Sequence, residues 1–186
     1  MIPPRMKRYL DKHHIQYRMF SHERTENLEE AAKCVEISLH ALAKAVLLID
    51  QEGVFSVAMI PYLEELDLVR ISRLADRPLG IVFGAGMNDP FVDCDPGSHP
   101  PIGEPYSLQT FMDISLRDFK EVYFEVGSHC CLVQVQQDDF QYLMADATWG
   151  HIIQAPVKHR SFLHKILSVA KNRHAVQKKN TRSTST

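Results

Sequence analysis

The run Ala41-Leu42-Ala43-Lys44-Ala45-Val46-Leu47-Leu48-Ile49 sets the architecture of this protein. It passes through an acidic turn with a glycine, residues 50–53, into a second apolar run over residues 54–61. Two short apolar runs joined by such a turn are typical of a hairpin of buried strands. Lys44 interrupts the first run. Because a buried unpaired ammonium is very costly, its side chain must either reach water along its own stem or point into a polar cavity.

The composition is that of one globular domain. The chain has 186 residues, of which 45% are hydrophobic and 24% charged, so it is long enough to bury a core. No apolar run approaches the ~18 residues of a membrane-spanning helix, and the first residues lack the apolar segment of a secretion signal. The cysteines show no C-x-x-C spacing, which favours reduced thiols. We therefore expect a cytoplasmic protein with no membrane partner.

Charge is distributed unevenly along the chain. The formal net charge is -2, yet residues 157–186 hold eight basic and no acidic residues. A basic C-terminus on an acidic body indicates contact with a polyanion, or else a solvated helix and tail, and both interpretations stay open. We predict one domain over residues 1–175 and a disordered tail over residues 176–186. The last predicted helix, about residues 160–173, and the residues just before it carry the candidate polyanion contacts Lys158, Arg160, Lys165, Lys171 and Arg173.

Short helices and short strands alternate without a regular pattern. Hydrophobic periodicity predicts helices over residues 3–14, 28–35, 39–43, 138–144 and 161–173, and strands over residues 15–20, 44–49, 54–61, 121–126 and 131–135. Thr25 or Asn27 is expected to cap the second helix, and Asp138 or Asp139 the fourth. Residues 89–105 contain five prolines and two glycines, which predicts an irregular loop. The sequence as a whole predicts a mixed α/β domain.

Three polar segments are candidates for a functional site: Lys44, the glycine- and proline-rich loop 95–103, and the break Gly127-Ser128-His129 between two apolar strands. Glycine allows backbone N–H groups to approach a ligand closely, and proline stiffens the loop that presents them. Such a loop suits the stabilisation of an oxyanion or the orientation of a water molecule. A lysine beside it is suited to bind a phosphate or to polarise a carbonyl. Each segment alone is also typical of an ordinary loop or turn.

These segments resemble one known family when they are taken together and in order. The matches are Ser21-His22-Glu23-Arg24-Thr25 with Glu30-Ala31-Ala32, the segment Ala43-Lys44-Ala45-Val46-Leu47, the loop Gly97-Ser98-His99-Pro100-Pro101 as a G-x-x-x-P motif, residues 122–129, and Asp138-Asp139-Phe140. The chain resembles, from about Tyr17 to Met144, the YbaK/EbsC-type aminoacyl-tRNA deacylases. That family is similar to the editing domain inserted into bacterial prolyl-tRNA synthetases.

The resemblance implies a mixed-sheet, barrel-like α/β domain with peripheral helices. It implies hydrolysis of mischarged aminoacyl-tRNA in trans, usually tRNA for proline that carries a smaller amino acid, with a synthetase as a further candidate partner and with no cofactor or metal. Lys44, Gly97 and Pro101 match the family's catalytic positions. Lys44 is expected to hold the terminal adenosine phosphate or the ester, and the loop backbone to place the water. The implied substrate-binding residues are Tyr17, His22, Thr25, Ser98, His99, Pro100, Gly127, Ser128 and His129.

The chain departs from the family pattern at two places. Glu36 stands where the family commonly has glycine, and Ser98 and His99 replace small or aliphatic residues inside the loop. The bulkier polar side chains are expected to narrow the pocket or to change which amino acid is accepted. One alternative is therefore a non-catalytic module that binds tRNA or a regulatory partner.

The sequence offers two alternatives to a deacylase: a metal site and a catalytic thiol. The cluster Asp93-Cys94-Asp95 with His99 or His129 is a possible metal site, although its spacing matches no common zinc pattern. Thiol catalysis through Cys130 or Cys131 has less support, because cysteines inside strands are more often apolar filling.

Overall fold

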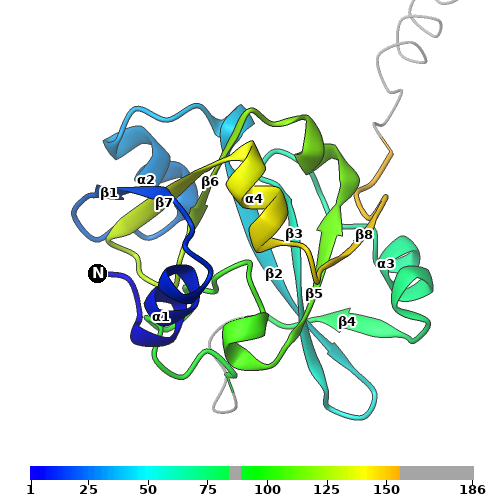
Figure 1. The fold of residues 1–186 in the computed structure, drawn as a ribbon. Coiled ribbons are helices and arrows are strands. Elements are labelled where there is room, and N and C mark those ends of the chain that lie inside the picture. The colour runs from blue at the N-terminus through cyan, green and yellow to red at the C-terminus, as the bar shows by residue number, and fades with distance from the viewer. Residues whose placement is uncertain (84–88, 156–186) are drawn as a thin grey trace, which may run out of the picture. The chain divides into compact units, whose positions relative to one another are not determined.

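The computed structural model describes residues 1–83 and 89–155, and Figure 1 shows two β-sheets with short helices around them. The predicted mixed α/β class is confirmed. The α-helices in this part of the chain are α1 (Pro4–Lys12), α2 (Leu28–Cys34), α3 (Leu68–Ala75) and α4 (Gln137–Leu143), and three short 3-10 helices lie at Leu39–Ala41, Glu104–Tyr106 and Ile114–Asp118. The strands are β1 (Tyr17–Ser21), β2 (Ala43–Asp50), β3 (Phe55–Pro61), β4 (Leu79–Ile81), β5 (Gln109–Asp113), β6 (Glu121–Glu125), β7 (Cys131–Gln136) and β8 (Thr148–Gly150).

The predicted hairpin forms the centre of the larger sheet. β2 and β3 pair antiparallel, with Lys44 opposite Ile60. Their turn contains Gly53 at a φ of 82°, and the Asp50 side chain accepts hydrogen bonds from two turn N–H groups. The sheet continues in the order β4-β2-β3-β5-β8, and the pairs β3–β5 and β5–β8 are parallel. The hairpin therefore presents Lys44 at the beginning of a strand that has neighbours on both sides.

The smaller sheet is antiparallel, with the order β1-β7-β6. It meets the larger sheet at one isolated parallel bridge between Leu42 and Tyr123. This contact brings the start of β2 next to β6. Among the described residues the two sheets stay separate apart from this bridge, so the strands do not close into a complete barrel.

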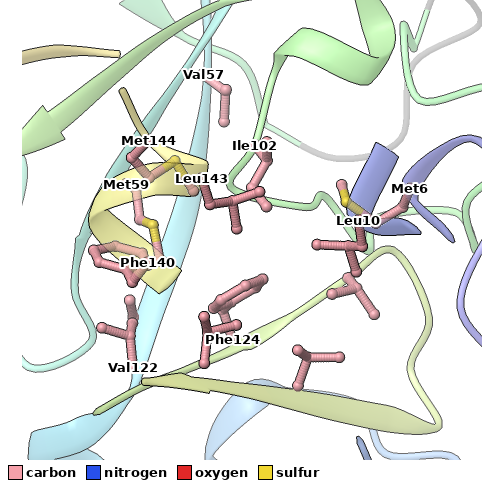
Figure 2. Close-up of a cluster of buried hydrophobic side chains, with 14 of the residues drawn as sticks. Met6, Leu10, Val57, Met59, Ile102, Val122, Phe124, Phe140, Leu143 and Met144 are labelled. Atoms are coloured by element: carbon pink, nitrogen blue, oxygen red, sulfur yellow. The ribbon is translucent and has the colours of Figure 1, made fainter. Parts of the chain in front are cut away.

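Side chains from both sheets and two helices share the main core (Figure 2). The cluster combines Val57 and Met59 of β3, Val122 and Phe124 of β6, Met6 and Leu10 of α1, and Phe140 and Leu143 of α4, with Met144 and Ile102. Ile102 is fully buried although it lies in the irregular segment between β4 and β5. Burial of such a side chain stabilises by about 1.5–3 kcal/mol, so the core anchors the loop that carries Gly97 to Pro101.

Local details confirm some expectations and correct others. Asn27 caps α2 by accepting from the Glu30 N–H at 2.9 Å. Glu36 has a φ of 57°, a left-handed conformation that glycine adopts more readily. The expectation that Asp138 or Asp139 caps the fourth helix was wrong, because α4 begins at Gln137 with Gln136 at the cap position. The predicted helix over residues 161–173 lies outside the described residues.

β4, β5 and β8 were not predicted, and each is at most five residues long. Within the described ranges, no helix has the length and apolar character needed to cross a membrane.

Candidate functional site

A cavity of about 230 Å³ lies where the start of β2 meets the loop before Ile102. Its walls come from segments that are far apart in the sequence: the beginning of α2, the start of β2, the residue after β3, the Gly97 loop and the end of β6. The lining residues are Glu26, Asn27, Leu28, Ala43, Lys44, Ala45, Tyr62, Gly97, His99, Pro101, Glu125 and His129. The three polar segments singled out in the sequence therefore meet in one place.

Lys44 enters the cavity from the first residues of β2. Its side chain is 24% exposed, and its Nζ lies 3.5 Å from Oε1 of Glu65 and 5.6 Å from the centre of the Tyr62 ring. The Glu65 side chain is 76% exposed, and such a solvent-facing ion pair contributes at most about 1 kcal/mol. The ammonium is therefore available to an anionic ligand that displaces Glu65.

Gly97 lies at the wall with its backbone uncovered. Its φ is 83°, in the left-handed region, and a Cβ placed on it would have no atom within 4 Å. The hydrogen bond from the Ser98 N–H to the Asp95 carbonyl, at 2.9 Å, closes the turn around it. The conformation and the open space together allow a ligand to approach the main chain at Gly97.

Asp95 joins the Gly97 loop to the turn after β6. Its Oδ2 accepts from the His129 N–H at 3.0 Å, and its own N–H donates to the Gly127 carbonyl at 2.9 Å. Arg24 forms a weaker contact of 3.4 Å with the same carboxylate. This role of Asp95 was not predicted from the sequence, because its partners lie more than 30 positions away along the chain.

His129 contacts the loop through its ring as well as its backbone. Nε2 lies 3.1 Å from the Pro96 carbonyl oxygen, and Nδ1 lies 3.2 Å from Oε1 of Glu125. Burial raises the pKa of the Glu125 carboxyl above its usual range, and the neighbouring His129 opposes that rise. Glu125 also lines the cavity, although the sequence analysis did not select it.

His99 narrows the cavity from the loop side. Its ring stacks on Phe91 with centroids 5.1 Å apart, and its Nε2 lies 2.8 Å from Oδ2 of Asp89. Both contacts fix the ring in place. In the part of the chain that the structure covers, no group of three or more His, Cys, Asp and Glu side chains is arranged to hold a metal ion.

The other predicted binding residues do not line the cavity. His22 and Thr25 bond through their backbone N–H groups to the carbonyls of Cys130 and His129, and Tyr17 pairs with Val135 between β1 and β7. Ser98, Pro100, Gly127 and Ser128 are buried residues. At Gly127 a Cβ would collide with Sγ of Cys94, so close packing accounts for this glycine. The binding roles of these seven residues stay predictions.

Two further expectations concern the basic C-terminal residues and the cysteines. The basic residues Lys158, Arg160, Lys165, Lys171 and Arg173 lie outside the described part of the chain. Burial raises the pKa of Cys94 to about 12 and also raises the pKa of Cys131. A raised pKa disfavours the thiolate form, so it gives no support to thiol catalysis through Cys131.

The fold and cavity define an α/β domain with a small polar site, and comparison with known proteins gives its family. The profile of the aminoacyl-tRNA editing domain matches residues 22–143, about two thirds of the chain. The chain belongs to this family, whose activity is translational editing. The resemblance recognised in the sequence is thereby confirmed. Among curated proteins, none matches this chain.

Solved structures share the fold at low sequence identity. A candidate trans-editing enzyme for prolyl-tRNA synthetase is 20% identical, with a TM-score of 0.67 over 83% of this chain and 100% of that one. A protein described only as hypothetical is 18% identical, with a TM-score of 0.70 over 81% of this chain and 99% of that one. A candidate signal-transduction protein from Marinobacter aquaeolei VT8 is 17% identical, with a TM-score of 0.63, and the match spans 83% of this chain and 31% of that protein.

Proposed function

We propose that this protein hydrolyses the ester bond of mischarged aminoacyl-tRNA in trans, with tRNA for proline carrying a smaller amino acid as the substrate class. The observation that carries the proposal is the convergence of Lys44, the open backbone of Gly97 and His129 in one cavity. Membership of the editing family supports it. The likeness to a candidate trans-editing enzyme adds support at the level of the fold.

The chemistry requires little from the side chains. A water oxygen forms a bond to the ester carbonyl carbon, the carbonyl oxygen becomes an oxyanion, and cleavage of the ester C–O bond releases the amino acid and the ribose hydroxyl of the tRNA. An ester is already activated, so positioning of the water and stabilisation of the oxyanion can supply the rate. In this proposal the loop around Gly97 holds the aminoacyl group, and the ammonium of Lys44 binds the terminal phosphate or the ester.

The size of the cavity favours a small aminoacyl group. Pockets for larger ligands measure roughly 300–1,000 Å³, whereas this cavity measures about 230 Å³. One missing methylene gives a synthetase only about 1–3 kcal/mol of discrimination, which is why a separate hydrolytic site is needed. A site that admits only small groups would spare correctly charged prolyl-tRNA.

The test is release of amino acid from alanyl-, cysteinyl- and seryl-tRNA for proline, with prolyl-tRNA as the correctly charged reference. Wild type is compared with Lys44→Ala, and with Lys12→Ala as a matched control, because Lys12 is an exposed lysine at the end of α1. We expect hydrolysis by wild type and Lys12→Ala, and a loss of about 100-fold or more in Lys44→Ala, the effect of removing one electrostatic contact to the transition state.

Failure to release any of these amino acids, by folded protein that still binds tRNA, would support a non-catalytic module instead. Full activity in Lys44→Ala would contradict the role given to Lys44.

A further inference from the structure

The side chain of His129 makes two hydrogen bonds that a neutral histidine beside an ionised glutamate cannot make. Nε2 lies 3.1 Å from the carbonyl oxygen of Pro96, and a carbonyl only accepts, so Nε2 must carry a proton. A neutral ring with its proton on Nε2 has a bare Nδ1. That nitrogen lies 3.2 Å from Oε1 of Glu125, and an ionised carboxylate also only accepts.

The contact between Nδ1 and Glu125 therefore needs one more proton. Either Glu125 is a neutral carboxyl that donates to Nδ1, or the ring is an imidazolium that donates to the carboxylate. The two arrangements contain the same number of protons and differ only in which atom holds the shared one. Burial of Glu125, which disfavours its isolated negative charge, is consistent with both.

We infer that Glu125 and His129 share one proton, and that this proton fastens the Gly97 loop to the wall of the cavity. Pro96 precedes Gly97 directly, so the bond from Nε2 fixes the carbonyl at the entrance to the turn. When the pair loses its proton, His129 can keep the bond to Pro96 or the bond to Glu125, but not both. Glu125 is thus a positioning residue for the proposed deacylation site. This part of the inference rests on the proposed function.

A second contact between the same segments does not depend on that proton. The backbone N–H of His129 donates to Asp95, so loss of the shared proton loosens the loop without releasing it. The other charged or titratable groups near the pair face it from several elements. They are Lys44, Glu26 and His99 across the cavity, Asp95 and Arg24 at the backbone of His129, and His22, which lies close enough to lower the pKa of Glu125. Cys131 of β7 also lies close enough for the charge of Glu125 to raise its pKa.

The direction of the pH dependence follows from the proton count. At lower pH the pair holds its proton and both bonds exist, whereas at higher pH the proton is released and one bond breaks. The loop is therefore ordered below the pH at which the pair titrates and loosened above it. In Glu125→Gln the amide N–H donates permanently to Nδ1 and the ring keeps its proton on Nε2, so both bonds persist without a titratable carboxyl.

NMR of the full-length protein tests the proton count without substrate. With ¹⁵N-labelled histidine and ¹³C-labelled glutamate, we expect either an imidazolium at His129 or a neutral carboxyl at Glu125 at neutral pH. We also expect the amide signal of Gly97 to shift as the pair titrates, and this shift to be absent in Glu125→Gln. An ionised Glu125 beside a neutral His129 at neutral pH would overturn the inference, and so would a Gly97 signal that does not follow the titration.

Deacylation kinetics test the positioning role. Wild type should lose about three- to tenfold in kcat/KM as the pair is deprotonated, the effect of one lost hydrogen bond. Glu125→Gln should lack this step, and Glu125→Ala should be impaired at every pH. Glu121→Gln, the same substitution at the first residue of β6, is the matched control, and its pH profile should match that of wild type. Equal pH profiles in wild type and Glu125→Gln would contradict the role.

The two proposals can fail separately. If the pair holds its proton and Gly97 follows it, but no aminoacyl-tRNA is hydrolysed, the proposed function is wrong and the coupling of the pair to the loop stands. If hydrolysis occurs while Glu125 is ionised beside a neutral ring, the proposed function stands and the inference about the shared proton is wrong.

Discussion

The backbone N–H of His129 donates a hydrogen bond of 3.0 Å to Oδ2 of Asp95, 34 residues earlier in the chain. The N–H of Asp95 returns a bond of 2.9 Å to the carbonyl of Gly127. The turn after β6 and the loop before Gly97 are therefore held together in both directions. The position of the open Gly97 backbone relative to Lys44 depends on this link as well as on the burial of Ile102.

Removal of the Asp95 carboxylate should reduce both stability and deacylation. Asp95→Ala leaves the His129 N–H without its acceptor, at a cost of about 1–3 kcal/mol in the free energy of unfolding. We expect deacylation to fall by tenfold or more, because the Gly97 loop is no longer held in position relative to His129. Asp93→Ala is the control, since Asp93 also accepts one backbone N–H, but from Arg5 at 2.9 Å and not from His129. Urea unfolding and single-turnover kinetics on both variants measure the two effects, and equal losses of activity would contradict the assignment.

A methyl group at Gly97 should block the site directly. Gly97 and Gly53 have nearly equal φ values, 83° and 82°, and neither would bring a Cβ within 4 Å of another atom. Alanine at either position therefore carries the same left-handed strain, about 1–2 kcal/mol. Only Gly97→Ala places its methyl group in the cavity, so we expect loss of deacylation there and normal activity in Gly53→Ala. Thermal unfolding of the two variants checks that the strain is matched, and full activity in Gly97→Ala would show that the substrate does not approach this backbone.

Substitution of His99 should widen the range of substrates. The His99 ring is held by Phe91 and Asp89, so it forms a fixed wall of the cavity. In His99→Ala that wall is removed, and larger aminoacyl groups gain access. We expect the ratio of prolyl-tRNA to alanyl-tRNA hydrolysis to rise by about tenfold or more, the discrimination that a methylene-sized difference supports.

The control for this effect is His151→Ala, which removes an exposed histidine that does not line the cavity. An unchanged ratio in His99→Ala would mean that another residue sets the size limit.

How much the sequence could predict follows from the range of the interactions. The β2–β3 hairpin and the Asn27 cap were predictable because neighbours within a few residues determine them. β8 is a three-residue strand whose parallel partner, β5, lies more than 30 residues away, and no local pattern specifies that pairing. Asp95 acquires its position in the site through His129, 34 residues away, and no local pattern specifies that contact. Glu125 contacts His129 only four residues on, but the contact depends on the turn between them, and hydrophobic periodicity does not specify it. The convergence of Lys44, Gly97 and His129 was expected only through the family resemblance.

The basic residues after Val157 should set the salt dependence of tRNA binding. A phosphate contact releases about 0.7–0.9 counterion per charge neutralised, so the slope of log Kd against log salt counts such contacts. We expect the full-length chain with glutamine at Lys158, Arg160, Lys165, Lys171 and Arg173 to bind tRNA more weakly and with a shallower slope. Hydrolysis at saturating tRNA should be retained, because Lys44, Gly97 and His129 of the proposed site are unchanged. Filter binding over a range of salt concentrations measures the slope. An unchanged slope would show that the tRNA contacts lie elsewhere on the protein. Loss of basic residues that contact the phosphate backbone of the tRNA must change the number of counterions released.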